Sequence, residues 1–145
     1  MLEITMSLSM KNIFLLCMLM LVWVDSLDLP RVKVSLTNNL EGKEDLNVHC
    51  KSKDDDLGQH LLHINQTFDW SFGPKFWGGT LFFCSFQWGK SPLLYLDAYV
   101  EKKDTCEDCH WYIHKDGPCR FEPKILPDPG QPPPPIVRRC YNWKR

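Results

Sequence analysis

A short motif, Cys106–Cys109 (CEDC), has the spacing of a zinc-binding or redox-active cysteine pair, and His110 and His114 follow it as further ligand types. A structural zinc site of this kind uses a second ligand pair at similar spacing, and thioredoxin-like chemistry requires a βαβ unit. The chain offers neither a second C-x-x-C pair nor the pattern of a βαβ unit. We therefore predict disulfide bonds at these cysteines and no metal site.

Three consecutive carboxylates, Asp54, Asp55 and Asp56, form the second group that could do chemistry. Calcium is bound by about six to eight oxygens, commonly from a D-x-D-x-D-G loop, and adjacent residues of an extended chain point in opposite directions. The spacing therefore favours a solvated connection over a calcium site. In such a connection one Asp accepts backbone N–H bonds, Gly58 relieves the backbone, and Lys51 and Lys53 offer charge compensation.

The five histidines form the third group. His60 and His63 would point to opposite faces of a strand, whereas His110 and His114 would share a face about 13 Å apart. This spacing leaves open an acid/base pair of the ribonuclease type. However, no nucleophile motif, serine elbow or glycine-rich phosphate loop accompanies these residues. We predict a protein without catalytic residues, enzymatic activity or a cofactor.

A sequon for N-glycosylation, Asn65-Gln66-Thr67, stands between two segments with the pattern of strands. An exposed loop is expected there, and such a loop in an exported chain is accessible to glycosylation. We predict a glycan on Asn65.

The first 26 residues have the pattern of a signal peptide. An apolar run from Ile13 to Val24 follows Lys11, and as a helix it would span only about 18 Å, too short for a bilayer. Val24 and Ser26 supply small residues before a cleavage site. We predict that residues 1–26 are removed and that the chain is secreted without membrane insertion; an N-terminal membrane anchor is the alternative.

Charge and cysteine content narrow the class of protein further. Without residues 1–26, the 145-residue chain keeps 16 of its 18 acidic and 16 of its 17 basic side chains. A net charge near zero with scattered basic residues argues against a nucleic-acid partner. An even set of cysteines remains, as in exported domains with up to three disulfides. This set is Cys50, Cys84, Cys106, Cys109, Cys119 and Cys140.

Apolar and polar residues alternate in short blocks, which is the period-2 pattern of half-buried strands. The blocks are 31–36, 45–50, 67–72, 82–88, 93–100 and 109–113, and 57–64 is less regular. Glycine, proline and asparagine separate the blocks, and no amphipathic helix is indicated. We predict one all-β domain over residues 27–121, a small antiparallel β-sandwich of about seven or eight strands whose inward cysteines cross-link the layers.

The composition changes after Phe121, because seven of the fourteen residues from Glu122 to Pro135 are prolines. Proline cannot donate ladder hydrogen bonds and favours the polyproline II conformation. We predict that residues 122–145 form a Pro-rich tail that acts as a stiff spacer; a ligand arm for another domain is the alternative. Cys140 could join this tail to Cys119.

Three segments, VHCKSKDDDLGQH, FDWSFGPKFWGGTLFFCSFQW and CEDCHWYIHKDGPCRF, occur in an order and spacing that closely resemble the plant self-incompatibility S1 family, the S-protein homologues. The resemblance runs from about Val32 to Phe121. It implies a small secreted β-sandwich with two core disulfides, in which Cys50, Cys84, Cys106 and Cys109 match the framework cysteines. Cys119, Cys140 and the Pro-rich tail depart from the common pattern.

The resemblance also implies a function. In the poppy members of the family, such a protein is released by the stigma and is an extracellular ligand recognised by a pollen membrane receptor. We accordingly expect a non-catalytic signalling or recognition ligand with a cell-surface receptor protein as its partner, and a recognition loop at Asp54, Asp55 and Asp56. A secreted hydrolase or ribonuclease and a secreted defence protein are the alternatives. Among about 15 possible disulfide connectivities, we expect Cys50–Cys109, Cys84–Cys106 and Cys119–Cys140.

Overall fold

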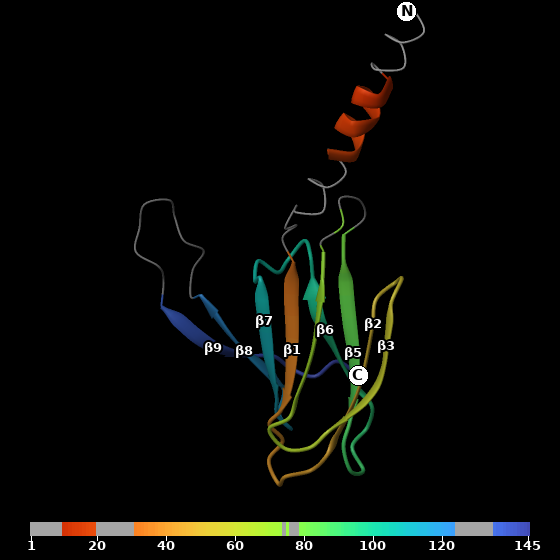
Figure 1. The fold of residues 1–145 in the computed structure, drawn as a ribbon. Helices are drawn as coiled ribbons and strands as arrows, with labels where there is room; N and C mark the ends of the chain where they lie inside the picture. The colour runs from red at the N-terminus through yellow and green to blue at the C-terminus, as the bar shows by residue number, and fades with distance from the viewer. Residues whose placement is uncertain (1–9, 20–30, 74, 76–78, 124–134) are drawn as a thin grey trace, which may run out of the picture. The chain divides into compact units, whose positions relative to one another are not determined.

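A computed structural model describes residues 10–19, 31–73, 75, 79–123 and 135–145 (Figure 1). The chain divides into two units, Met1–Pro30 and Arg31–Arg145. In the first unit, residues 10–19 form a helix. Among the described residues, no helix has the length and apolar character needed to cross a membrane.

The second unit consists of two β-sheets. Its described strands are β1 (Val32–Asn38), β2 (Leu46–Lys51), β3 (Asp56–Leu62), β4 (Thr67–Phe72), β5 (Leu81–Gln87), β6 (Leu94–Val100), β7 (Asp108–Ile113), β8 (Pro118–Pro123) and β9 (Ile136–Cys140). Strands β4-β1-β7-β8-β9 form a five-stranded sheet, and β3-β2-β5-β6 form a four-stranded sheet. The predicted all-β, disulfide-bonded class is confirmed, with nine described strands.

Strand β1 lies inside the five-stranded sheet, where it pairs with β4 in antiparallel and with β7 in parallel orientation. The other pairs in the two sheets are antiparallel. The sandwich therefore contains a parallel pair that the alternation pattern did not predict. Parallel neighbours require a long crossover connection, and here the connection between β1 and β7 includes the four-stranded sheet and β4.

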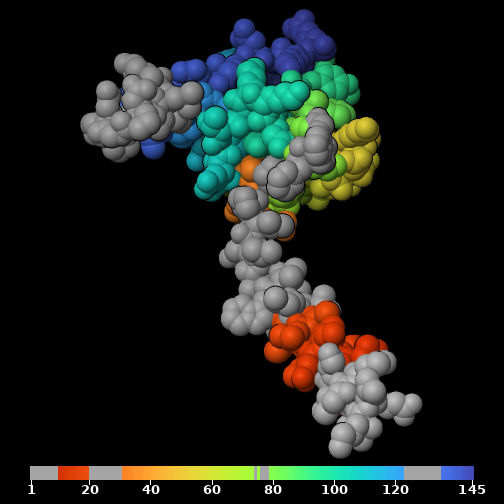
Figure 2. All heavy atoms as spheres, turned by 90° about the horizontal axis from the view of Figure 1, so that it is seen from above, coloured from red at the N-terminus to blue at the C-terminus, as the bar shows by residue number. Residues whose placement is uncertain are grey.

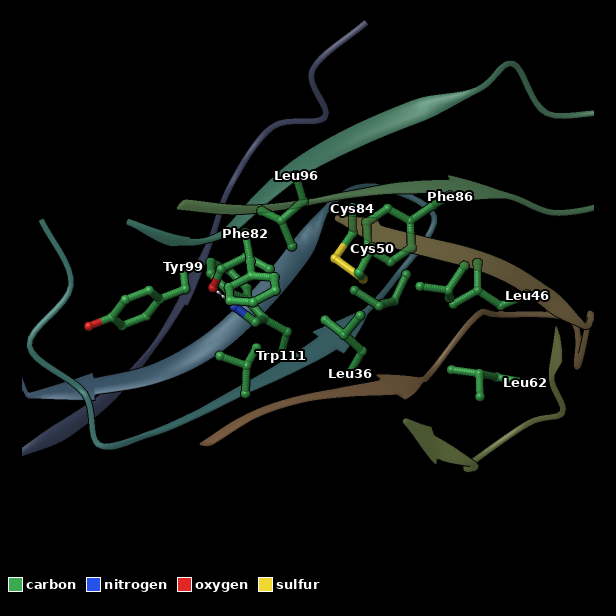
Figure 3. Packing of buried hydrophobic residues seen from close by; sticks show 14 of the residues in the cluster. Leu36, Leu46, Cys50, Leu62, Phe82, Cys84, Phe86, Leu96, Tyr99 and Trp111 are labelled. Atoms are coloured by element: carbon green, nitrogen blue, oxygen red, sulfur yellow. Dashed lines mark hydrogen bonds between the residues drawn. A yellow bond between two sulfur atoms is a disulfide. The ribbon is translucent and has the colours of Figure 1, made fainter. Parts of the chain in front are cut away.

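The core between the sheets is formed by the apolar members of the alternating blocks (Figure 3). Side chains with at most 1% exposure include Val34, Leu36, Leu46, Val48, Phe86 and Ile113. Burying a side chain of this size contributes about 1.5–3 kcal/mol, so these positions hold the two sheets together. Trp111 of β7 also donates its Nε1–H to the carbonyl oxygen of Ala98 in β6 over 2.9 Å, which joins the layers.

Three disulfides are formed, Cys50–Cys84, Cys106–Cys109 and Cys119–Cys140. The expected pair Cys119–Cys140 is present, but the expected pairs Cys50–Cys109 and Cys84–Cys106 are wrong. Cys50 and Cys84 lie directly opposite each other on β2 and β5, so their bond joins neighbouring strands of one sheet and does not cross-link the layers. Cys106 and Cys109 close a local loop at the start of β7.

The C-terminal residues differ from the predicted tail. Residues 136–140 form β9, an edge strand that pairs with β8, and β8 itself continues to Pro123. Beyond β9, Tyr95 of β6 and Lys144 form an isolated antiparallel bridge. Residues 124–134, which hold most of the prolines, lie outside the described residues, as does the expected cleavage site after Ser26.

The connections between strands gather at the two ends of the sandwich (Figure 1). The β2–β3 turn, the β4–β5 connection and the β6–β7 connection lie at the end where β1 begins. The ion pair between Lys75 and Asp54 joins the β4–β5 connection to the β2–β3 turn. A Glu101 carboxylate oxygen accepts the N–H of Thr80, which joins the β6–β7 connection to the β4–β5 connection. The β3–β4 and β7–β8 turns lie at the opposite end, because β7 runs parallel to β1.

Candidate functional site

Ser52 organises the turn between β2 and β3. Its N–H donates to the carbonyl oxygen of Asp55 over 2.8 Å, and its hydroxyl oxygen accepts the N–H groups of Asp54 and Asp55 over 3.3 and 3.0 Å. Serine side chains commonly hold turns by bonding to nearby backbone groups. The turn is thereby held by its own residues, and the three carboxylates remain exposed.

Asp56 belongs to the β2–β3 hairpin. Its Oδ1 lies 2.6 Å from Nε2 of His49 and accepts the Gly58 N–H over 3.0 Å, and its Oδ2 lies 3.2 Å from Nζ of Lys51. The hydrogen bond with His49, followed by that from Gly58, holds the pKa of the Asp56 carboxyl well below its usual range. Gly58 has a φ of 76°, where the β2–β3 register shifts. The predicted solvated connection, with one Asp accepting a backbone N–H, is confirmed.

Asp54 and Asp55 extend from the hairpin at the end of the sandwich. Asp54 forms an ion pair with Lys75 of the β4–β5 connection. Asp55 accepts a hydrogen bond from the Ser52 hydroxyl over 3.3 Å, and among the described residues it has no ion-pair partner. Asp55 therefore retains a carboxylate that no described cation neutralises.

A pocket of about 180 Å³ lies between this turn and the β4–β5 connection. Lys53 and Asp55 line it, together with the apolar side chains of Phe72 and Leu81 and with Thr80. Thr80 is only 8% exposed, and its hydroxyl has no hydrogen-bond partner in the described part of the chain. A buried polar group without a partner is costly, and this hydroxyl oxygen is itself almost inaccessible to solvent.

His110 of β7 and His114, which follows this strand, bond to different residues. Nε2 of His110 lies 2.7 Å from the Thr37 hydroxyl, and its ring stacks on Tyr112 with centroids 4.6 Å apart. Nδ1 of His114 lies 2.8 Å from Oε1 of Glu41. Each ring thus has its own hydrogen-bond partner on a different element.

The remaining histidines also have local partners. Nδ1 of His63 lies 2.7 Å from Oδ1 of Asp45, and the ring of His60 stacks on Phe68 with centroids 3.8 Å apart. Within the described ranges, no group of three or more His, Cys, Asp or Glu side chains is arranged to hold a metal ion. The His60 ring therefore packs against β4, whereas His63 pairs with a carboxylate outside the strands.

Asn65 is exposed in the β3–β4 turn, at the end of the sandwich opposite the Asp54–Asp56 segment. It has a φ of 63°, a left-handed conformation that Asn tolerates in turns, and its N–H donates to the carbonyl oxygen of Asn38 over 2.8 Å. Thr67, the last residue of the sequon, begins β4. The acceptor amide thus stands on a surface turn.

The pocket residues of the β4–β5 connection were not predicted from the sequence. Lys75, Thr80 and Phe72 are far from the Asp triplet along the chain, and only the pairing of strands brings them to the same end of the sandwich. The one local signal was the mixture of glycines with a lysine after Phe72, which marks a connection but not its neighbours.

Fold and site together define a class, a small disulfide-bonded β-sandwich that presents charged side chains on loops at the end of a rigid scaffold. This arrangement is consistent with a non-catalytic recognition protein. The family described as plant self-incompatibility protein S1 matches residues 33–143, and the chain belongs to this family.

Several S-protein homologues of Arabidopsis thaliana are similar to this chain. S-protein homolog 5 is 40% identical over 116 residues, which cover 79% of this chain and 80% of the homologue. S-protein homolog 2 is 42% identical over 119 residues, covering 77% of this chain and 68% of the homologue. S-protein homolog 19 is 42% identical over 114 residues, covering 77% and 76%. No solved structure gives a significant match.

Proposed function

We propose that this protein is a secreted, non-catalytic ligand that is recognised by a receptor protein on the surface of a plant cell. Membership of the S1 family supports this role, and three disulfides are typical of proteins that fold in an oxidising compartment. In this proposal residues 1–26 are a signal peptide and the site of action is extracellular.

The observation that carries the proposal is the position of Asp55. Its carboxylate is exposed, lacks an ion-pair partner among the described side chains and stands on a turn that Ser52 holds in place. The turn follows directly from β2, where Cys50 is bonded to Cys84. Binding residues are commonly found on loops that a rigid scaffold positions, and an ordered loop loses less entropy on binding.

The structure distinguishes the three carboxylates, so each can be tested separately. Asp56 pairs with His49 and Lys51 within the hairpin, and its replacement would disturb the fold as well as the surface. Asp55 can be changed with little effect on these contacts. We therefore assign the main charged contact with the receptor to Asp55, next to the pocket that Thr80 lines.

A cell-surface binding assay tests this assignment. The secreted protein would be labelled and titrated onto plant membrane fractions, where we expect saturable binding that Asp55→Asn weakens about tenfold, as for a contact worth roughly 1.4 kcal/mol. The matched control is Asp116→Asn, an exposed position in the β7–β8 turn at the opposite end of the sandwich. An equal loss in both variants, or saturable binding that neither changes, would contradict the role of Asp55.

Secretion is tested by the N-terminus of the product. Expression of the full chain in plant cells should release a protein that begins at Leu27, identified by N-terminal sequencing. A cell-associated product that retains residues 1–26 would contradict the proposed signal peptide.

We also propose a glycan on Asn65, because this residue lies exposed in a turn of a chain that we place in the secretory route. Digestion of the secreted protein with an amidase that removes N-glycans should lower its mass, and Asn65→Gln should abolish the difference. A secreted wild-type protein whose mass does not change would contradict occupancy of this site.

A further inference from the structure

We propose that the Cys119–Cys140 disulfide is a thiol-exchange site, which a low-molecular-weight thiol such as glutathione opens by attack on Sγ of Cys140. The proposal is independent of receptor binding. It depends on two properties of the three disulfides, the exposure of each cysteine and the charge beside each sulfur, because access and leaving-group acidity control the rate of exchange.

Exposure separates the three disulfides. Cys50 and Cys84 are both fully buried, at 0% exposure. Cys109 is 1% exposed, although its partner Cys106 is half-buried. Cys140 is exposed on the edge strand β9. Figure 2 shows the blue C-terminal residues at the surface of the domain. An external thiolate can therefore reach Cys140 most easily.

The charge beside Sγ of Cys119 also favours thiol exchange at the Cys119–Cys140 disulfide. Nη2 of Arg138 lies 3.5 Å from Sγ of Cys119, so a guanidinium stands beside the sulfur that leaves as a thiolate when Cys140 is attacked. A nearby cation lowers the pKa of a thiol, and a more acidic thiol leaves faster. At this disulfide the exposed sulfur, that of Cys140, is the one attacked, and the sulfur that leaves, that of Cys119, is the one beside the guanidinium.

The Cys106–Cys109 disulfide has the opposite arrangement. Nη1 of Arg120 lies 3.9 Å from Sγ of Cys106, the more accessible of the two cysteines. Departure of Cys106 as the stabilised thiolate would require attack on Cys109, which is buried. Attack on Cys106 would instead release Cys109, whose Sγ lies 3.4 Å from the Cys106 carbonyl oxygen, closer than the 3.8 Å between Sγ of Cys119 and the Gly117 carbonyl oxygen. The predicted order of opening therefore begins at Cys119–Cys140.

The exchange balances in two steps. A thiolate attacks Sγ of Cys140, a new S–S bond forms to the small thiol, the Cys119–Cys140 bond breaks, and its electron pair remains on Cys119 as a thiolate. A second thiolate attacks the sulfur of the small thiol in the mixed disulfide, which releases Cys140 as a thiolate and forms the disulfide of the small thiol. The protein disulfide is reduced by two electrons, and two small thiols are oxidised.

Opening this bond removes the covalent link between β8 and the end of β9, from which the C-terminal segment continues. Residues 141–145 then depend on non-covalent contacts: the Tyr141 N–H donates to the Pro118 carbonyl oxygen over 2.9 Å, and the Tyr141 hydroxyl donates to Glu122 over 2.7 Å. The ring of Trp143 packs on Phe86 and Trp88, with centroids 5.3 and 5.7 Å away. We expect faster amide exchange at residues 141–145 once the bond is open.

Differential alkylation tests the order and the direction of the exchange. The full mature protein would be incubated with reduced glutathione, quenched with acid, alkylated with iodoacetamide and digested without further reduction for mass spectrometry. We expect glutathione on Cys140 and the alkyl group on Cys119 before any other cysteine reacts. Glutathione on Cys119, earlier opening of Cys106–Cys109 or Cys50–Cys84, or no opening of any bond would overturn the proposal.

A matched pair of variants tests the guanidinium. Arg138→Gln removes the cation beside Cys119 and should slow the first step about threefold or more, because the leaving thiol becomes less acidic. Arg139→Gln changes the neighbouring residue, which pairs with Glu122, and should leave the rate within about twofold of the wild type. Equal rates for the two variants, with both folded as judged by circular dichroism, would overturn the role of Arg138.

Discussion

Arg120 shows how a single charged side chain is accommodated between the sheets. Its side chain is 13% exposed, its Nη2 lies 2.6 Å from Oδ1 of Asp104, and its Nε donates to Oε1 of Glu122. The guanidinium also stands over the Trp111 ring, 4.7 Å from the centroid. Buried charges are tolerated when they are paired in this way, and loss of one partner leaves the others uncompensated.

The first prediction concerns this residue. Arg120→Met should lower the free energy of unfolding by about 3–5 kcal/mol, because the carboxylates of Asp104 and Glu122 would lose their buried partner. Arg139→Met is the control, since the Arg139 side chain is 51% exposed, and it should cost about 0.5 kcal/mol or less. Urea unfolding curves of the two variants measure the difference. A loss below about 1 kcal/mol in Arg120→Met would contradict the structural role of the pair.

The second prediction is a pH dependence that arises at Glu41. The N–H of Lys115 donates to this carboxylate over 3.0 Å, and this bond lowers the pKa of Glu41 to about 2; burial opposes the shift and the hydrogen bond with His114 adds to it. A lowered pKa stabilises the fold above about pH 4.5, and this stabilisation is lost as the pH falls towards 2. Because Glu41 is exposed, solvent screening limits the effect to about 1 kcal/mol or less.

The variant Glu41→Gln should remove this contribution. Its unfolding free energy should lie below that of the wild type at pH 6, and the difference should shrink between pH 4.5 and pH 2. Thermal unfolding across this pH range provides the measurement. A difference that stays constant with pH would show that Glu41 does not titrate as the structure indicates.

At the scale of the elements, the strands with alternating apolar residues could be predicted, including the partly exposed β4, whereas β8 and β9 could not. β2, β5 and β7 alternate between buried and more exposed residues, and the period-2 pattern reports this directly. β6 alternates only in part, and β1 is buried throughout from Val34 to Asn38. β9 is almost entirely exposed and β8 carries a proline at each end. Because hydrophobic periodicity reports burial and not hydrogen bonding, a polar edge strand leaves no such pattern.

The candidate site was predictable in part for a similar reason. The exposure of Asp54–Asp56 and the role of Gly58 follow from local turn chemistry, which the sequence contains. The Lys75–Asp54 pair and the buried Thr80 hydroxyl depend on which connections meet at one end of the sandwich. The cysteine pairs depend on strand register in the same way, since Cys50 meets Cys84 only because β2 pairs with β5.

The third prediction tests the contact between the β7–β8 turn and the C-terminal segment. A Cβ atom on Gly117 would lie 2.0 Å from the carbonyl oxygen of Tyr141, so Gly117→Ala requires the segment to move. We expect a loss of about 1–3 kcal/mol, the usual cost of overpacking. Gly73→Ala is the matched control, because no atom of the described residues lies within 4 Å of its added Cβ. Urea unfolding should separate the two variants, and equal stabilities would contradict this close approach.

For the molecule as a whole, the loop that each disulfide closes sets its expected contribution to stability. Cys50 and Cys84 are 34 residues apart, whereas Cys106 and Cys109 are three apart. In the chain-entropy treatment, the longer loop corresponds to about 4 kcal/mol and the shorter loop to about 2 kcal/mol. The two bonds therefore differ in their expected contribution to the free energy of unfolding.

The fourth prediction follows from this difference. The double variant Cys50→Ala/Cys84→Ala should lose roughly 2 kcal/mol more unfolding free energy than Cys106→Ala/Cys109→Ala. Guanidinium unfolding of both proteins gives the comparison, with the intact Cys119–Cys140 bond checked by mass spectrometry. A larger loss in the Cys106/Cys109 variant would contradict the ordering.

The parallel pairing of β1 with β7 also bears on how the chain folds as it is synthesised. Val34 of the first strand lies opposite Cys109 of the seventh, so a chain that emerges N-terminus first completes the five-stranded sheet only after β7 has appeared. Contacts between residues this distant in sequence slow folding. We therefore infer that the four-stranded sheet, whose strands are closer in sequence, can form before the sheet that contains β1. In this order β1 pairs with β4 first and with β7 later.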